Sequence, residues 1–182
     1  MCENGILGDN KNSGLVVLVN NRDGDIGLED KLIAHEKGEL HRAFSVFIFN
    51  NKGEMLLQKR AKTKYHSKGL WTNACCGHPK RDESVYAAAF KRLYEEMGFN
   101  CTLQERFSFI YKGFVGNGLT EHEFDHVFIG KYNGPVKPDP DEAEKYAWRN
   151  AEYLEKDVSK HPSRYSYWFR CIFKKVLDYK KQ

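Results

Sequence analysis

The sequence predicts an α+β domain in which the strands of a mixed sheet surround one central helix. Short apolar runs separated by turn-forming residues are typical of strands. An amphipathic stretch at residues 82–97 is typical of a helix, and two further helical patterns lie near the end of the chain. A chain of 182 residues can bury a core as one domain. We expect residues 14–182 to form that domain and residues 1–13 to be a flexible N-terminus.

The first half of the chain carries the signals of a strand and a hairpin. Residues 14–19 form an apolar run, and turn formers follow at residues 20–24, so we expect a short buried strand. Residues 43–50 and 55–59 flank an Asn-Asn-Lys-Gly turn, which predicts a β-hairpin. Residues 71–76 are predicted to be extended up to the Gly-His-Pro that follows them.

The central helix has a predicted start, end and buried face. We expect Asp82 to cap its N-terminus and Gly98 to end it. Arg92 and Glu96 lie four residues apart and share a face. The apolar stripe that should face the core consists of Val85, Ala88, Ala89, Leu93 and Met97.

The second half of the chain is expected to add strands, one loop and two helices. A glycine-rich turn at residues 116–118 should join two strands, and three prolines mark a loop at residues 133–142. The predicted strands are residues 107–115, 120–132 and 145–148, and the predicted helices are residues 151–158 and 163–180.

Composition favours a cytoplasmic protein with a small anionic ligand. The net charge of +4 is not gathered in a long basic block, so nucleic-acid binding has weak support. A few focused cations suit a small anion better. No run approaches the roughly 18 apolar residues of a membrane helix, and residues 1–13 lack the apolar core of a signal peptide. Five cysteines, an odd number, argue against a disulfide framework. The sequence leaves the oligomeric state open.

Two groups of residues could together bind a divalent ion. Glu121 and Glu123 occupy alternate positions of a predicted strand and share a face, where they could chelate a metal or divide into ligand and acid. For such a pair alone, a solvated, charged strand face is more common. His35 and His41 flank a predicted polar loop, and histidine is a neutral ligand near neutral pH. With His78 they would form a set of three nitrogens and two carboxylates suited to Mn, Fe, Zn or Mg.

Residues 77–99 resemble a Nudix box, whose pattern is G-x5-E-x7-R-E-U-x-E-E-x-G-U. The Arg-Glu pair of the box is replaced here by Lys91 and Arg92, so a carboxylate that a hydrolase needs for metal becomes a cation. The resemblance implies a Nudix-type α/β/α sandwich with a mixed sheet, in which hydrolysis is lost. The matching positions are Gly77, Glu83, Lys91, Arg92, Leu93, Tyr94, Glu95, Glu96, Met97, Gly98 and Phe99.

Three further segments make the resemblance closer. The segment from His35 to Phe44, residues 72–79 and residues 121–123 together resemble the type I isopentenyl-diphosphate isomerases, which are Nudix-fold enzymes. The match covers nearly the whole chain, and T-N-x-x-C-G-H-P is a specific motif. It implies interconversion of isopentenyl and dimethylallyl diphosphate in isoprenoid biosynthesis, by adding a proton at one carbon and removing one from another through a tertiary carbocation.

The resemblance also implies the catalytic and metal-binding residues. Cys76 matches the catalytic thiol, and Cys75 is then a buried neighbour. Glu123 matches the second catalytic group, and Tyr111 the tyrosine that hydrogen-bonds it. The implied metal site, for Mn, Zn or Mg, consists of His35, His41, His78, Glu121 and Glu123.

The substrate would be held by cations, a second metal and an aromatic ring. Glu96 matches a carboxylate that binds Mg²⁺ together with the diphosphate, and Trp168 matches a lid over the hydrocarbon. The cations that match the diphosphate site are Arg60, Lys64 and Arg92. Several of these residues also have plainer roles open to them. Arg60 and Lys64 follow a hairpin strand and could be solvated cations, and Tyr111 could be a core aromatic. Arg92 could form a surface pair with Glu96 worth about 0.3–0.5 kcal/mol, and Trp168 could be a core aromatic.

Three other functions are open from sequence alone. A Nudix hydrolase of a nucleoside diphosphate derivative would release phosphate and would not need Cys76. A non-catalytic ligand-binding Nudix domain would account for Lys91 and Arg92 but would leave Cys76 and Glu123 without a role. A thiol hydrolase using Cys76 and His78 lacks an evident third group to orient the histidine.

Overall fold

A nine-stranded mixed sheet lies between two layers of helices. The computed structural model describes residues 14–180, so the predicted flexible segment 1–13 lies outside the described residues. The strands are β1 (Leu15–Val19), β2 (Asp25–Asp30), β3 (His41–Phe49), β4 (Met55–Arg60), β5 (Trp71–Thr72), β6 (Cys75–Gly77), β7 (Leu103–Gly116), β8 (Leu119–Lys131) and β9 (Ala143–Arg149). The helices are α1 (Lys31–Lys37), α2 (Val85–Met97), α3 (Ala151–Lys160) and α4 (Tyr167–Lys180), with a short 3-10 helix, η1 (Pro162–Arg164).

Strand β3 is the centre of the sheet. It runs parallel to β8 along its whole length, and its other edge pairs antiparallel with β1, β6 and β4 in turn. The pairing with β8 sets His41 beside Glu123, and the pairing with β6 sets Ser45 beside Cys76. The register of β3 therefore brings together segments that are far apart in the sequence.

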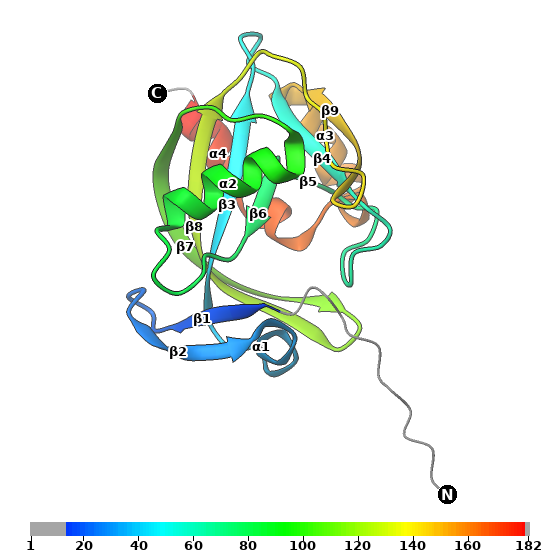
Figure 1. Cartoon of the computed structure of the whole chain (residues 1–182). Helices are drawn as coiled ribbons and strands as arrows, with labels where there is room; N and C mark the ends of the chain where they lie inside the picture. The colour runs from blue at the N-terminus through cyan, green and yellow to red at the C-terminus, as the bar shows by residue number, and fades with distance from the viewer. Residues whose placement is uncertain (1–13, 181–182) are drawn as a thin grey trace, which may run out of the picture.

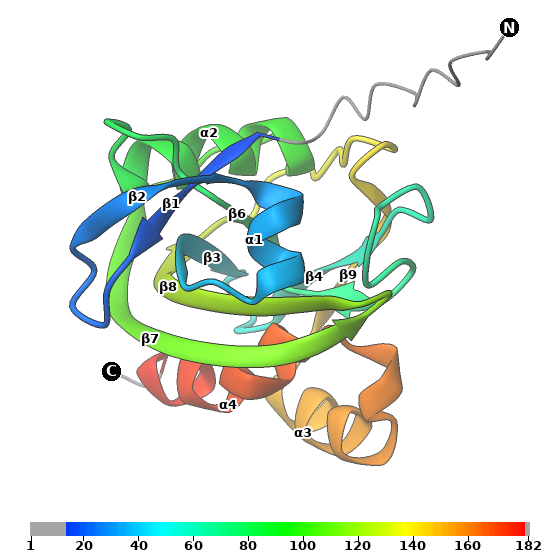
Figure 2. The same ribbon diagram turned by 90° about the horizontal axis from the view of Figure 1, so that it is seen from below.

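The two helical layers follow from the alternation of side chains along β3. Phe44, Val46 and Ile48 pack in the apolar cluster under α2, whereas Phe47 and Phe49 pack in the cluster under α3 and α4. Figure 1 shows α2 in front of the sheet with α3 and α4 behind it, and Figure 2 shows the same three layers from below. The predicted α/β/α sandwich with a mixed sheet is confirmed.

The central helix starts later than predicted. Ser84, and not Asp82, is the N-cap, because the Ser84 hydroxyl accepts a hydrogen bond from the Ala87 amide at 3.1 Å. Asp82 instead has a left-handed backbone (φ 64°) in the turn before the helix. The predicted end is correct, since Gly98 (φ 74°) closes the last turn.

The polar loop predicted around His35 is wrong. Strand β2 and helix α1 occupy this segment. The Asp30 carboxylate caps α1 by accepting from the amides of Leu32 and Ile33, and Gly38 ends the helix at φ 64°. The two cap residues were visible in the sequence, but a seven-residue helix is too short to produce a clear apolar period.

Two other predicted elements are divided in the structure. The extended segment 71–76 becomes β5 and β6, with Asn73 and Ala74 between them. The helix predicted at residues 163–180 becomes η1 followed by α4, with Ser166 fully buried at the junction. No helix among residues 14–180 is long and apolar enough to cross a membrane.

Neighbouring residues of α2 should differ sharply in their effect on stability. Leu93 is 0% exposed and Tyr94 is 61% exposed. Leu93→Ala should lower the free energy of unfolding by about 2–5 kcal/mol because it leaves a cavity in the core. Tyr94→Ala should change it by less than about 0.5 kcal/mol. Urea denaturation measures both, and equal losses would contradict the packing of α2 against the sheet.

Candidate active site and metal centre

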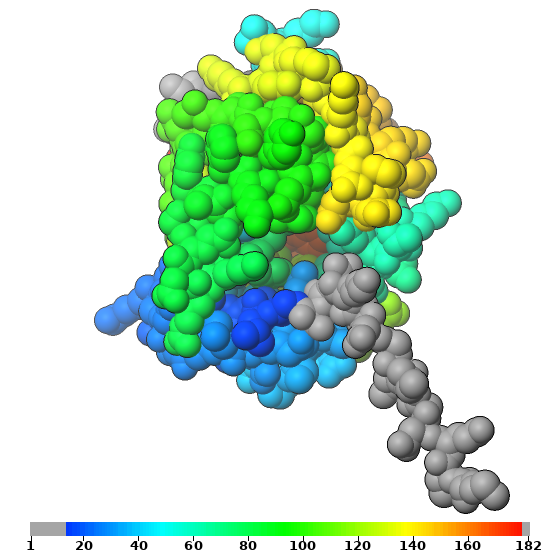
Figure 3. Space-filling model, in the orientation of Figure 1, coloured from blue at the N-terminus to red at the C-terminus, as the bar shows by residue number. Residues whose placement is uncertain are grey.

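Two joined cavities lie where β3, β6 and β8 meet α1. The inner chamber has a volume of about 60 Å³ and the outer cleft about 340 Å³. Figure 3 shows the molecule hollowed between the α2 layer and the β1–α1 segment. The residues that line both cavities are Lys31, Arg60, Cys76, Gly77 and His78. A ligand could therefore place one end in each.

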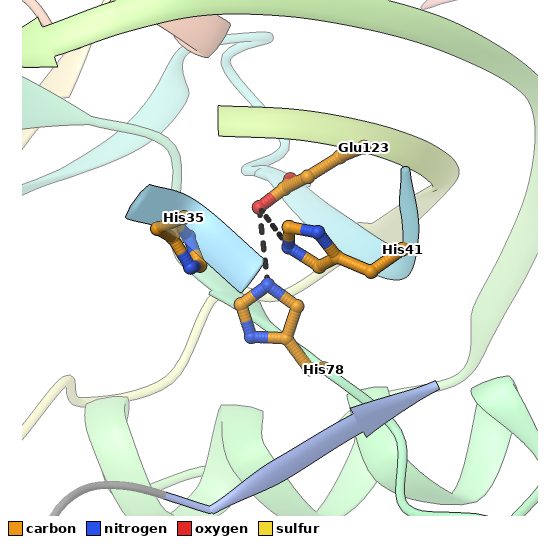
Figure 4. Close-up of side chains that lie close together, drawn as sticks. All are labelled: His35, His41, His78 and Glu123. Atoms are coloured by element: carbon orange, nitrogen blue, oxygen red, sulfur yellow. Dashed lines mark hydrogen bonds and ion pairs between the residues drawn. The ribbon is translucent and has the colours of Figure 1, made fainter. Parts of the chain in front are cut away.

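Four predicted metal ligands converge beside the inner chamber. His35 comes from α1, His41 from the start of β3, His78 from the residue after β6, and Glu123 from β8 (Figure 4). One ligand atom of each lies within 4.8 Å of those of the other three. The His41 ring centroid is 4.9 Å from that of His35 and 4.9 Å from that of His78. Three imidazoles and a carboxylate form a set that can bind a divalent metal.

Backbone contacts fix the orientation of two of these imidazoles. The Nδ1 atom of His35 lies 2.6 Å from the Lys31 carbonyl oxygen, and that of His41 lies 2.8 Å from the Glu39 carbonyl oxygen. A carbonyl only accepts, so each Nδ1 carries the proton and each Nε2 keeps its lone pair. Both Nε2 atoms are buried without a hydrogen-bond partner. The Nε2 atom of His41 lies 3.6 Å from Glu123 Oε1 (Figure 4), and buried lone pairs gathered in this way fit a bound cation.

Burial keeps the imidazoles of His35 and His78 neutral. It lowers the pKa of His35 to about 4 and the pKa of His78 to about 3. Burial raises the pKa of Glu123, but the neighbouring His41 and His78 outweigh it and hold that pKa well below the usual range of a glutamate. At neutral pH His35 and His78 therefore offer neutral nitrogens and Glu123 an ionised carboxylate, the forms that bind metal.

Glu121 does not join this group of four. Its Oε1 atom lies 3.5 Å from Nε2 of His66, and its Oε2 atom accepts a hydrogen bond from the Tyr111 hydroxyl at 3.2 Å. Glu121, His66 and His35 form an adjoining set whose ligand atoms also lie within 4.8 Å of one another. Sequence reasoning missed His66, because it stands in a polar loop without any periodic pattern. Burial, followed by the charge of Arg60, lowers the pKa of His66 to about 2.

The carboxylates of β8 face the interior of the protein. Glu121, Glu123 and Asp125 are 3%, 7% and 0% exposed, so the alternative of a solvated charged face is wrong. β8 lies between β3 and β7, and this face is turned toward the chamber. Tyr111 is the β7 partner of Glu123 and donates a 2.6 Å hydrogen bond to its Oε2 atom.

The two adjacent thiols point to different places. Cys76 lines both cavities, and its Sγ atom donates to Oδ1 of Asn73 at 3.2 Å. Cys75 is fully buried and donates instead to Glu96 Oε1 at 3.5 Å. Burial, followed by the charge of Asp125, raises the pKa of Cys76, so it is a neutral thiol at neutral pH. Cys76, and not Cys75, can reach a ligand in the chamber.

The predicted cations line the outer cleft and are paired to different degrees. Arg92 donates to Glu95, Glu96 and Glu142 at 2.7, 2.9 and 3.0 Å. Lys64 also pairs with Glu142. Glu96 is buried, so its pair with Arg92 belongs to the cleft rather than to the open surface.

Arg60 keeps a donor free for a new partner, although one guanidinium nitrogen donates to the His66 carbonyl at 3.3 Å. Its Nε atom is buried without a hydrogen bond, and its guanidinium lies 5.3 Å from the Trp168 ring centroid. Trp168 and Lys31 also line the inner chamber. Burial, followed by the charge of Arg60, lowers the pKa of Lys31. Sequence reasoning missed Lys31 and Glu142, because isolated charged residues carry no signal until the fold brings them to a cleft.

The chain is similar to known proteins in sequence and in fold. It matches the NUDIX domain over residues 39–169. It is 48% identical over 162 residues to Isopentenyl-diphosphate Delta-isomerase 1 of Aromatoleum aromaticum, spanning 89% of this chain and 92% of the relative. It is 51% identical over 158 residues to Isopentenyl-diphosphate Delta-isomerase 2 of Photorhabdus laumondii, spanning 87% and 89%. The crystal structure of a MutT protein from Methanosarcina mazei has a TM-score of 0.63 at 22% identity, over 79% of this chain and 96% of that one, which shows the fold alone.

Metal binding should depend on the buried imidazoles. After chelation and dialysis, His41→Ala should bind Mn²⁺ or Zn²⁺ at least about tenfold more weakly than the unaltered chain, because an oriented ligand is lost. His161→Ala, at the exposed end of α3, is the matched control and should bind normally. Isothermal titration calorimetry measures both, and equal affinity in the two variants would contradict the metal centre.

Stability of the metal-free chain should fall in mild acid. The pKa of His35 and His78 is lowered from 6.5 in the folded chain, so the unfolded chain takes up more protons below pH 6.5. Stability is therefore full above pH 6.5 and falls as the pH drops toward about 4, the folded pKa of His35. His35→Gln should reduce the fall. Thermal denaturation across this range tests it, and a constant midpoint would be the contrary result.

Proposed function

The chain belongs to the isopentenyl-diphosphate Delta-isomerase family of NUDIX-domain proteins, and from that membership we propose that it interconverts isopentenyl and dimethylallyl diphosphate in isoprenoid biosynthesis. One observation carries the proposal at the level of the site. A neutral thiol, Cys76, and an ionised carboxylate, Glu123, line the same small chamber, and Trp168 lines it with them. These are a proton donor, a proton acceptor and a group that stabilises a cation.

The reaction needs both proton-transfer groups at once. One group gives a proton to the terminal methylene carbon of isopentenyl diphosphate, which leaves a positive charge on the tertiary carbon. The other removes a proton from the carbon between that centre and the diphosphate-bearing carbon, and the double bond forms there. We assign these two steps to Cys76 and Glu123, whose roles exchange when the reaction runs backwards. Tyr111 holds the Glu123 carboxylate in place through its 2.6 Å hydrogen bond.

The chamber suits a short-lived carbocation. An alkene is a weak base, so the acid must be close and water must be kept out. The Trp168 ring is 3% exposed and could stabilise the positive charge by about 2 kcal/mol or more when the site is dry. A divalent ion (Mn, Zn or Mg) bound by His35, His41, His78 and Glu123 would supply fixed positive charge that orients the carboxylate, and Glu121 lies in the adjoining set with His66 and His35.

The outer cleft would hold the diphosphate. We propose Arg60, Lys64 and Arg92 as its cations and add Lys31, which lines both cavities. Lys64 and Arg92 would exchange their carboxylate partners for phosphate oxygens, and a guanidinium can offer two parallel hydrogen bonds. Mg²⁺ bound with the diphosphate would take Glu96 as its protein ligand.

The same cleft argues against the Nudix hydrolase of a nucleoside diphosphate derivative. Arg92 stands where the box has a glutamate, and it neutralises Glu95 and Glu96 instead of adding a metal ligand. A guanidinium can bind a diphosphate, but unlike a glutamate it cannot bind the metal that activates water in a hydrolase. The likeness to MutT extends to the fold alone, whereas the isomerase relatives are identical at about half of the aligned positions.

The setting of the reaction also belongs to this proposal. We propose a small isoprenoid diphosphate as the partner, with neither nucleic acid nor membrane, and the cytoplasm as the location. Cys75, Cys76, Cys101 and Cys171 are free thiols, which fits a reducing compartment.

Solvent-proton exchange gives the sharpest test of the reaction. In deuterated water with Mg²⁺, the chain should incorporate deuterium into both diphosphates without releasing phosphate. Cys76→Ala and Glu123→Gln should each lower the rate by about 10²–10⁴-fold, the usual contribution of a general acid or base. Cys75→Ala is the matched control, because its thiol faces away from the chamber, and it should retain most activity. Full activity in Cys76→Ala, or loss only in Cys75→Ala, would overturn the assignment.

A further inference from the structure

We propose that Asn73 is a positioning residue that holds the Cys76 thiol and the Trp168 indole in a fixed arrangement around the substrate. This inference rests on the proposed function. Asn73 is 0% exposed and is not among the residues that line either cavity. It would therefore act on the reaction through Cys76 and Trp168, the two side chains in contact with it that line the inner chamber.

Two hydrogen bonds fix the orientation of the Asn73 amide. Its Nδ2 atom donates to the Val46 carbonyl at 3.1 Å and to the Cys75 carbonyl at 2.7 Å. Both acceptors are backbone groups of β3 and β6, so the amide cannot turn over without losing both bonds. The Oδ1 atom must then face away from these strands' carbonyls, toward the donors on its other side.

That oxygen accepts from both reaction-site side chains. The Cys76 Sγ atom lies 3.2 Å from Oδ1, and the Trp168 Nε1 atom lies 3.1 Å from it. Cys76 belongs to β6 and Trp168 to α4, so one atom links the two elements directly behind the chamber. These two hydrogen bonds to one oxygen atom orient the S–H bond of Cys76 and fix the position of the Trp168 indole ring relative to it.

Further hydrogen bonds hold the N-terminal end of α4, next to Trp168. The Ser166 hydroxyl donates to the Thr72 hydroxyl at 2.8 Å, and the Thr72 hydroxyl donates to Asn73 Oδ1 at 2.9 Å. The Ser166 amide also donates to the Trp71 carbonyl at 2.9 Å. A chain of buried hydrogen bonds of this kind strengthens each member. Thr72 therefore supports Asn73 without touching the thiol or the indole.

The chemistry requires such an arrangement. The thiol must reach one carbon of a five-carbon group while the ring faces the carbon that becomes positive. A displacement of about 1 Å between reacting groups can cost on the order of 10² in rate. Substrate binding depends mainly on the cations of the outer cleft, so a loss of this arrangement should reduce kcat much more than it changes KM.

Asn73→Leu removes all of these bonds while keeping a side chain of similar size. We expect kcat to fall about 10- to 100-fold and KM to change less than about threefold. A purely structural role for Asn73 would not lower kcat while leaving KM nearly unchanged. Thr72→Val is the matched control: it removes the third donor to Oδ1 and leaves the bonds from Cys76 and Trp168, so its kcat should fall less than about fivefold whatever its thermal stability.

A double variant tests the link to the indole. Trp168→Phe keeps an aromatic ring and loses the N–H donor, so its rate loss combined with Asn73→Leu should be smaller than the product of the two separate losses. Multiplicative losses would show that Asn73 does not act through Trp168 and would overturn the proposal.

Each remaining outcome is decisive. Should the leucine variant not fold, Asn73→Ser, whose hydroxyl can still serve one carbonyl, carries the same test. Failure of both to fold would make Asn73 a core residue and overturn the inference, as would unchanged kcat or a change confined to KM. If the unaltered chain does not exchange deuterium, the proposed function itself fails. If the unaltered chain is active and the Asn73 variants are equally active, this inference fails and the proposed function stands.

Discussion

The parallel pairing of β3 with β8 is the constraint on which the rest of the structure depends. The two strands pair residue by residue, from His41 with Glu123 to Phe49 with Lys131, and this pairing fixes the register. Since side chains alternate along a strand, a slip of one residue would turn the β8 carboxylates away from the chamber. The opposite edge of β3 holds β6 and thereby places Cys76 level with Ser45. The thiol, His41 and the carboxylates meet because β6 and β8 both pair with β3, and helix α1 adds His35.

Burial then gives these groups their chemical character. Removing ionisable groups from water disfavours their charged forms, so the imidazoles of His35 and His78 stay neutral and the Cys76 thiol stays protonated. The arrangement is costly for stability, because the Nε2 atoms of His35 and His41 are buried without a partner. A bound cation would offset that cost. Perturbed ionisable groups gathered in one cavity are typical of functional sites.

Elements with a clear period or a specific end residue were predictable, and the others were not. The β-hairpin, the central helix and its Gly98 terminus follow from local patterns, as does the sandwich implied by the box. Asp82 failed as the N-cap because the chain turns through a left-handed conformation there, and Ser84 takes its place. Helix α1 was missed because it is short. His66 and Lys31 were missed because no local pattern marks a residue that the fold alone brings to a cavity.

The sequence by itself determined the family, the alternation that divides the core into two layers, and the residue types that could serve the chemistry. These follow from local spacing, which the chain carries wherever it folds. Only the tertiary structure decided that Glu121 lies with His66 rather than with the group of four, and that Asn73 joins Cys76 to Trp168. Such contacts join strands and helices distant in sequence, and strand register and helix docking set them.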